Sequence, residues 1–252
     1  MGIIIKSEEE IAVMRQAGRI VAAVLVILSQ RVKAGMKTKE LDIIAERELK
    51  KLGGRSSFKG YRGYPASICV SVNDEIVHGI PGEKVLKEGD IVSLDFGAIY
   101  DGFQGDAAVT VAIGEVSPAA KRLIAATRGS LEAGIAAAHA GAKMGDISAA
   151  IQGYAESRGF SVVREYTGHG IGREMHEDPQ IHNFGSPGTG TVLKKGMTFA
   201  LEPMLNAGDW RTRVADDHWT VLTADGSLSA HFEHTIAITD AEPEVLTQGV
   251  YA

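Results

Sequence analysis

Two aspartates beside one predicted β-hairpin are the first residues whose types and spacing suggest chemistry. The dipeptide Asp101-Gly102 stands between two apolar runs, which is a strong signal for a two-residue hairpin turn. That turn places Asp95 opposite Ala108 and leaves Asp106 on the same face, diagonally ~7–8 Å away at the backbone. Two buried carboxylates repel each other unless a cation lies between them. The pair therefore predicts either a metal site or two exposed acids on a solvated hairpin.

A glycine-rich segment, residues 167–177, carries two histidines, His169 and His176. The glycines on both sides of His169 free the backbone to bring the imidazole close to a partner. A single histidine is more often structural than functional. Two histidines in one such segment favour a metal ligand or an acid–base group, with a structural role as the alternative.

Two glutamates interrupt apolar runs: Glu202 within residues 199–205 and Glu233 within residues 232–238. An acid in an apolar strand is costly unless it is paired or coordinated. Carboxylate oxygens with one imidazole suit divalent Mn, Fe(II), Co or Zn. The candidate ligands are thus two aspartates, two glutamates and one histidine: Asp95, Asp106, His169, Glu202 and Glu233. Five ligands exceed the usual three of one catalytic zinc, and shared carboxylates can hold two ions ~3.5–4 Å apart in a hydrolase.

An internal repeat relates the two halves of the chain. Residues 34–41 resemble residues 140–147, and residues 85–95 resemble residues 192–202, at nearly the same offset. The second match superimposes Asp95 on Glu202. Chance similarity of common loops is the alternative. We expect one catalytic domain over residues 1–252, built from halves of about 7–113 and 114–240, with these carboxylates meeting where the halves join.

The elements that must position these residues follow the same plan in each half. Ser7 and Glu10 form a capping box that opens a helix ending near residue 32, and Thr38 is expected to cap a second helix, 39–51. Ser117-Pro118 opens a helix to about residue 139, followed by another over 146–158. Strand-like runs follow each helix pair: 68–72, 90–100, 103–113, 199–205, 219–223 and 230–239. Helices followed by strands indicate an α+β fold with the sheet as the inner layer.

The composition excludes several classes of protein. The chain has 252 residues, with 44% hydrophobic and 23% charged, which is ordinary for a globular domain and excludes disorder, collagen and coiled coil. A single cysteine, Cys69, cannot form an internal disulfide and favours a reducing, cytoplasmic location. The longest apolar stretch, residues 20–30, is expected to be too short to span a bilayer, and the N-terminus has no signal-peptide layout.

Net charge is −6, which argues against a dedicated nucleic-acid binder. The basic stretch, residues 31–62, nevertheless holds ten Lys or Arg and four Asp or Glu. It is either a solvated helix face or a docking surface for an anionic partner.

Several motifs together give the chain a resemblance to the type I methionine aminopeptidases of the pita-bread fold, which aminopeptidase P, prolidase and creatinase share. The resemblance runs from about Ile4 to Thr247. It rests on Tyr61-Arg62-Gly63-Tyr64-Pro65, Asn73-Asp74-Glu75 with His78-Gly79-Ile80-Pro81, Asp95 with Gly102-Phe103-Gln104-Gly105-Asp106, Gly168-His169-Gly170-Ile171-Gly172 with His176-Glu177, Leu201-Glu202-Pro203, and residues 229–235. It implies a pseudo-twofold, duplicated fold in which two helix pairs cover a curved antiparallel sheet.

The resemblance also implies a role for each site residue. The metal ligands would be Asp95, Asp106, His169, Glu202 and Glu233, with Asp106 and Glu233 bridging two divalent ions. Glu202 would also serve as the general base, His78 would contact the scissile amide and His176 would steady the carbonyl oxygen. The methionine pocket would be lined by Tyr61, Tyr64, Cys69 and Trp219, and a monovalent cation (Na or K) would lie at Asn73, Glu75 and Ser229.

The implied activity is hydrolytic removal of N-terminal methionine from peptides and nascent proteins, with a small second residue preferred, by a cytoplasmic monomer. Because nascent chains emerge at the ribosome, the basic stretch could dock on ribosomal RNA. Two alternatives remain: an X-Pro aminopeptidase or prolidase-like hydrolase, and a non-catalytic pita-bread binding module. Met175 replaces a Phe of many relatives and Gly97 a Thr of some, which bears on the shape of the pocket.

Overall fold

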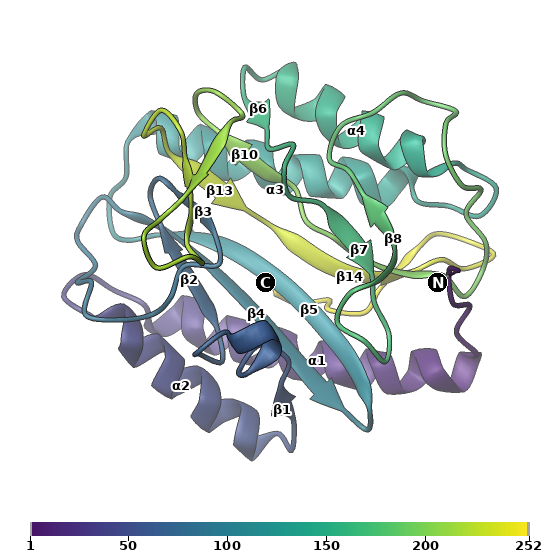
Figure 1. Cartoon of the computed structure of the whole chain (residues 1–252), viewed down its shortest axis with the longest axis horizontal. Helices are drawn as coiled ribbons and strands as arrows, with labels where there is room; N and C mark the ends of the chain where they lie inside the picture. Colours follow the sequence, from purple (N-terminus) through teal and green to yellow (C-terminus); the bar gives the residue numbers. More distant parts are fainter. Residues whose placement is uncertain (1, 251–252) are drawn as a thin grey trace.

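Four helices and a set of antiparallel sheets make up the fold in the computed structural model, which describes residues 2–250. The helices form two pairs, and in Figure 1 one pair lies below the sheet and the other above it. The pairs are α1 (Glu8–Arg31) with α2 (Thr38–Lys51), and α3 (Pro118–Ala137) with α4 (Met144–Glu156). A 3-10 turn, η1 (Tyr61–Gly63), lies after α2. The α+β, pseudo-twofold fold predicted from the sequence is confirmed.

The largest sheet within residues 2–250 has nine strands in the order β1-β4-β5-β14-β9-β7-β8, with β2 also paired to β4 and β15 to β14. Their bounds are β1 (Arg55–Ser56), β2 (Cys69–Val72), β4 (Ile91–Tyr100), β5 (Phe103–Ala112), β7 (Gly168–Gly170), β8 (Glu177–Ile181), β9 (Thr198–Leu201), β14 (Glu233–Ala237) and β15 (Glu244–Val245). Two smaller sheets flank it: β13 (Ser229–His231), β10 (Met204–Asn206) and β6 (Ser161–Val162), and β11 (Thr212–Val214), β12 (Val221–Thr223) and β3 (Glu75–Val77).

The β4–β5 hairpin has the register expected from its turn, with Asp95 opposite Ala108. Both tip residues adopt positive φ, +46° at Asp101 and +79° at Gly102, as a type I′ turn requires. Side chains alternate between the two faces of a strand. Leu94 and Phe96 therefore join the hydrophobic core under α1, while Asp95 points to the opposite face.

Helix α1 begins with the predicted capping box, in which Ser7 and Glu10 cap each other's backbone N–H groups. The helix lies very close to β5: a Cβ on Gly105 would be 2.9 Å from the backbone N of Gly18. Its apolar side, including Leu25 and Leu28, is fully buried in the main core.

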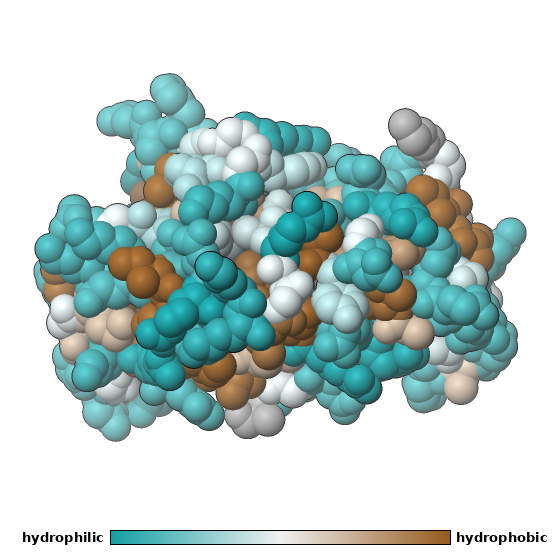
Figure 2. Space-filling model, turned by 90° about the horizontal axis from the view of Figure 1, so that it is seen from below, coloured by the Kyte–Doolittle hydropathy of each residue, from teal (hydrophilic) through white to brown (hydrophobic). Residues whose placement is uncertain are grey.

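Residues 20–30 were expected to be too short to span a bilayer, but the helix that contains them is long and apolar enough by length and composition alone. Helix α1 contains an 18-residue window with mean hydropathy 1.9, because the helix continues the apolar run on both sides of Arg19. In the folded chain, however, 56% of that window is buried, and α1 packs on β4 and β5 as a core helix. The surface seen from below in Figure 2 is mainly hydrophilic, with hydrophobic residues in separate groups.

The helix starts differ slightly from the sequence prediction, and in the same way in both halves. Lys37, not Thr38, is the N-cap of α2, and its backbone N–H donates to Glu40. Lys143 caps α4 equivalently, with Asp146 as the acceptor in the first turn. Each capping residue also forms an isolated β-bridge, Lys37 with Val85 and Lys143 with Val192, at the repeat offset. We propose that the two halves meet near residues 113 and 114.

Two predicted strands are interrupted, and a third is shorter than predicted. Residues 199–205 are broken at Glu202 and Pro203, residues 230–239 at Phe232, and the run from Trp219 becomes strand only at Val221. Strands β7 and β8 were not predicted, because the glycines of β7 give no strand signal in the sequence. These breaks matter because Glu202 lies in one of them.

Candidate metal centre and substrate pocket

Three central strands carry acids to one place on the sheet. Asp95 and Asp106 come from the β4–β5 hairpin, and Glu233 from β14, where it pairs with Ala108 of β5. Ligand atoms of Asp106, His169 and Glu233 all lie within 4.8 Å of one another. All five residues expected as metal ligands line the same pocket, so the structure brings them together.

His169 and Glu202 reach this centre from the second half of the chain. His169 lies in β7 beside Ala200 of β9, and Glu202 follows β9 directly. The Nε2 of His169 is 3.5 Å from Oε1 of Glu202. The Nδ1 of His169 is 2.9 Å from the carbonyl of Gly170, which only accepts, so Nδ1 carries the proton and Nε2 keeps a lone pair.

Burial raises the pKa of all four carboxyl groups, and repulsion by neighbouring carboxylates adds to this in three of them. Burial raises the pKa of Asp95 from 3.8 to about 7. Burial, then the charge of Asp95, raises the pKa of Asp106 and of Glu202 well above their ordinary values. Burial and then Asp106 do the same for Glu233. Without a cation, the protein surroundings therefore do not stabilise four ionised carboxylates at this place.

The donor set fits a divalent metal. The Oδ1 atoms of Asp95 and Asp106 are buried and have no hydrogen-bond partner within residues 2–250. Buried oxygens of this kind need a cation or a donor, and neutral Nε2 of His169 offers a further ligand atom. Carboxylates with one imidazole suit Mn, Fe(II), Co or Zn.

Two further histidines line the pocket. His176 lies against His169, with 4.2 Å between ring centroids, and its Nδ1 is 2.8 Å from the hydroxyl of Tyr61, whose ring stacks on it. His78 has φ +61°, an uncommon conformation for a residue other than glycine, and its ring contacts Trp219 edge-to-face. Burial lowers the pKa of both imidazoles to about 4, so both are neutral at pH 7.

An apolar compartment adjoins the carboxylates. Tyr64 and Cys69 are buried there, and the ring of Tyr64 packs edge-to-face on Trp219. The Tyr64 hydroxyl lies 2.9 Å from the carbonyl of Gly79 and 3.1 Å from that of Ile68, and its single proton can be donated to either one, which fixes the ring. The apolar compartment and the carboxylate cluster belong to one pocket of about 140 Å³.

Two of the three residues expected to hold a monovalent cation bond to each other in this structure, and the third bonds to other residues. The carbonyl of Asn73 accepts from the backbone N–H of Ser229 at 2.8 Å. The Glu75 carboxylate accepts from the N–H of Val72 and pairs with Lys84.

Sequence reasoning gave no role to several residues of the pocket. Phe58, Arg62 and Val77 line it, and His231 lies fully buried behind it with Nε2 3.8 Å from Oε2 of Glu233. The position of His231, two residues before Glu233 in residues 229–235, was the available signal. Met175, noted as a departure from relatives, also lines the pocket.

Known proteins resemble this chain in sequence and fold over nearly its whole length. The model of metallopeptidase family M24 matches residues 12–240. The chain belongs to metallopeptidase family M24. It is 52% identical to methionine aminopeptidase 1 of Bacillus subtilis, over 98% of this chain and 99% of the relative. The crystal structure of methionine aminopeptidase from Thermotoga maritima superposes with a TM-score of 0.96 at 51% identity, covering 98% of this chain and 99% of that one.

A more distant likeness to a solved structure concerns the fold alone. Prolidase from Pyrococcus furiosus has a TM-score of 0.80 at 22% identity, covering 97% of this chain and 65% of the prolidase. The shared fold therefore does not by itself select between methionine and proline specificity.

Proposed function

We infer that this M24 enzyme is a methionine aminopeptidase, which removes N-terminal methionine from peptides and proteins by metal-dependent hydrolysis. Full-length identity of 52% to a protein of that name carries this conclusion. The pocket supports it, because an enclosed compartment of aromatic residues and one thiol, beside a carboxylate cluster, suits a thioether side chain.

We propose that Asp95, Asp106, His169, Glu202 and Glu233 hold two divalent ions, with Asp106 and Glu233 shared. The ion in the cell would be Mn, Fe(II), Co or Zn, and a Na or K ion would occupy the site of Asn73, Glu75 and Ser229. Divalent ions at such a centre polarise the scissile carbonyl and make a water acidic enough to attack at neutral pH.

The chain's own groups then orient the substrate and move the proton. The Asp95 carboxylate, next to the apolar compartment, would face the substrate's α-amino group and so restrict cleavage to the first residue. Glu202 would take the proton from the attacking water and deliver it to the leaving amine. His78 would contact the scissile amide.

His176 would donate to the carbonyl oxygen as negative charge develops on it. The hydroxyl of Tyr61 at Nδ1 supports this role, because a hydroxyl that donates there leaves the proton of the neutral ring on Nε2.

The experiment compares two peptides and two variants. With Mn²⁺ or Co²⁺ added, the enzyme should cleave Met-Ala-Ser and leave Gly-Pro-Leu intact. Glu202→Gln and His169→Ala should fold and be inactive. Cleavage of the proline peptide instead would establish the X-Pro hydrolase, and absence of both metal binding and turnover would establish a non-catalytic module. Substantial activity of both variants would refute the assigned roles.

We further propose a cytoplasmic monomer that meets its substrates as nascent chains with small second residues. The unpaired Cys69 and the buried core helix α1 support this location. Within the basic stretch, Lys37 and Lys39 pair with Glu83, and Arg47 and Lys51 pair with Glu48. Docking on ribosomal RNA would then rest on the remaining cations, such as Lys33, Lys50 and Arg55. Ribosome co-sedimentation should fall with Lys50→Glu and Arg55→Glu, and an unchanged yield would exclude the proposal.

A further inference from the structure

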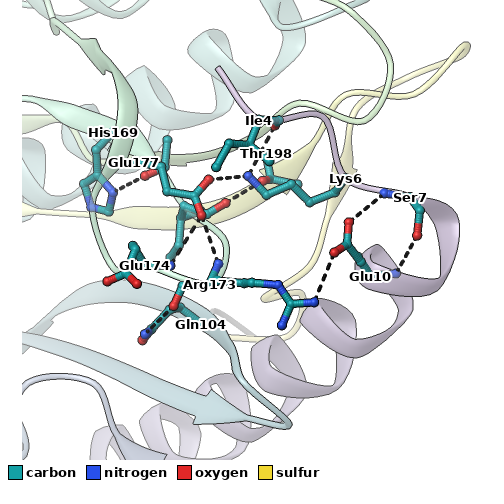
Figure 3. Close-up of polar contacts among 12 residues, drawn as sticks. Ile4, Lys6, Ser7, Glu10, Gln104, His169, Arg173, Glu174, Glu177 and Thr198 are labelled. Carbon is teal, nitrogen blue, oxygen red and sulfur yellow. Dashed lines mark hydrogen bonds and ion pairs between the residues drawn. The ribbon is translucent and has the colours of Figure 1, made fainter. Parts of the chain in front are cut away.

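A buried ion pair ties the N-terminal segment of the chain to the loop that carries His176. The ammonium of Lys6 donates to Oε2 of Glu177, and the two side chains are only 3% and 5% exposed. Figure 3 shows the pair between the segment before α1 and Glu177, the first residue of β8, which directly follows that loop. Burying two charges is costly unless both are fully partnered.

Both partners have further bonds that fix them. The backbone N–H of Lys6 donates to the carbonyl of Gly196 at 2.8 Å, and its ammonium also donates to the carbonyl of Ile4 at 3.3 Å. Oε1 of Glu177 accepts from the backbone N–H groups of Arg173 at 2.9 Å and Glu174 at 3.3 Å. One carboxylate therefore closes the loop on itself with Oε1 and attaches it to Lys6 with Oε2.

The Lys6 side chain passes close to Gly172 of the loop. A Cβ on Gly172 would lie 2.4 Å from Cε of Lys6 and 2.5 Å from Oε1 of Glu177. A side chain at this position would therefore displace the lysine stem or the carboxylate, and Gly172 has no positive φ.

Other contacts hold the backbone on both sides of His176. Thr198 Oγ1 donates to the carbonyl of Ile171 at 2.5 Å, and the N–H of Gln104 donates to the carbonyl of Gly172 at 2.8 Å. The side-chain amide of Gln104 also donates to the carbonyl of Arg173 at 3.2 Å. Glu177, directly after His176, begins β8, where its backbone pairs with Gly170, and its side chain is attached to Lys6 (Figure 3).

We propose that Lys6 is a positioning residue: through Glu177 it sets the place of His176 in the pocket, beside Tyr61 and His169. The inference rests on the proposed function, in which His176 donates to the substrate carbonyl. A displacement of about 1 Å at such a group can reduce the rate a hundredfold. Loss of the lysine charge should therefore lower kcat by about tenfold to a hundredfold and leave the KM for a Met peptide within about twofold.

The decisive experiment is a double-variant cycle in the full-length, metal-loaded enzyme. Lys6→Met keeps the length of the stem and removes the charge, and its effect is measured alone and combined with His176→Ala. If Lys6 acts through His176, it should change kcat less than about twofold once His176 is gone. Equal losses in both backgrounds would overturn the proposal, because the lysine would then act on the enzyme by another route.

A matched control is available on the same side of the molecule. Lys195 forms an exposed pair with Glu8 and Asp240, and Lys195→Met should leave kcat unchanged. Should Lys6→Met not fold, Glu177→Gln replaces it in the cycle, since an amide oxygen still accepts from the two backbone N–H groups and only the charge is lost.

Hydrogen exchange in the metal-free protein gives a readout that does not depend on activity. The amides of Arg173 and Glu174 should exchange at least tenfold faster in Lys6→Met than in Lys195→Met. Unchanged exchange, with kcat also unchanged, would refute the proposal. If the wild-type enzyme does not cleave Met peptides, the proposed function fails instead, whatever the exchange rates are.

Discussion

Replacing Asp95 by asparagine should stabilise the metal-free protein, although it removes a proposed metal ligand. Burial raises the pKa of this carboxyl group from 3.8 to about 7. One pKa unit corresponds to about 1.4 kcal/mol, so the aspartate costs the metal-free fold roughly 4 kcal/mol at pH 7. An asparagine has no such cost, but its amide leaves a buried donor unpaired. We expect about half of the 4 kcal/mol to remain as a net gain in the free energy of unfolding. That is ~2 kcal/mol, or a rise of roughly 4–8 °C in Tm for a chain of this size.

The stability difference between Asp95→Asn and the wild type should decrease as the pH falls. As the pH falls from 7 towards 4, the folded protein takes up a proton at Asp95 before the unfolded chain does. Wild-type stability therefore rises, and the advantage of Asp95→Asn should vanish near pH 4. Thermal unfolding in EDTA at pH 7 and at pH 4 measures both quantities. Asp101→Asn, at the exposed tip of the same hairpin, is the control and should change Tm little at either pH.

Metal addition should make the wild type more stable to heat than Asp95→Asn. A ligand at a hundred times its Kd stabilises the folded state by about 2.7 kcal/mol, and Mn²⁺ or Co²⁺ should raise the Tm of the wild type accordingly. The variant should show a smaller rise. A variant less stable than wild type in EDTA at pH 7, or an advantage that persists at pH 4, would refute the electrostatic account of this centre.

Two further predictions concern contacts around the pocket and the core. Tyr61→Phe removes the hydroxyl at Nδ1 of His176 and should lower kcat about threefold to tenfold in a folded enzyme. An unchanged kcat would mean that this bond does not orient the ring. Gly105→Ala places a methyl group 2.9 Å from the backbone of Gly18 and should lower the free energy of unfolding, measured with urea, by about 1–3 kcal/mol. Gly153→Ala, in α4 with open space around it, is the control and should stabilise slightly.

Local signals in the sequence determined much of the fold and several site residues. The Asp101-Gly102 turn predicted the register of β4 with β5, and the capping box of Ser7 predicted the start of α1. Both depend on residues close together in the chain, where backbone preferences act directly. Acids in apolar runs and glycines around His169 similarly indicated the five candidate ligands, because each departs from a local preference, as residues of a functional site often do.

Tertiary structure alone decided which distant residues meet and how they are held. Nothing near Lys6 in the sequence indicates that its ammonium lies buried against Glu177, 171 residues away. The strand β7 forms because β9 and β8 supply its hydrogen bonds, although its glycines disfavour a strand. The same holds for α1, whose composition would fit a membrane and whose burial depends on the sheet beneath it. Local preferences are short-ranged, whereas burial and charge pairing are settled only when the whole chain packs.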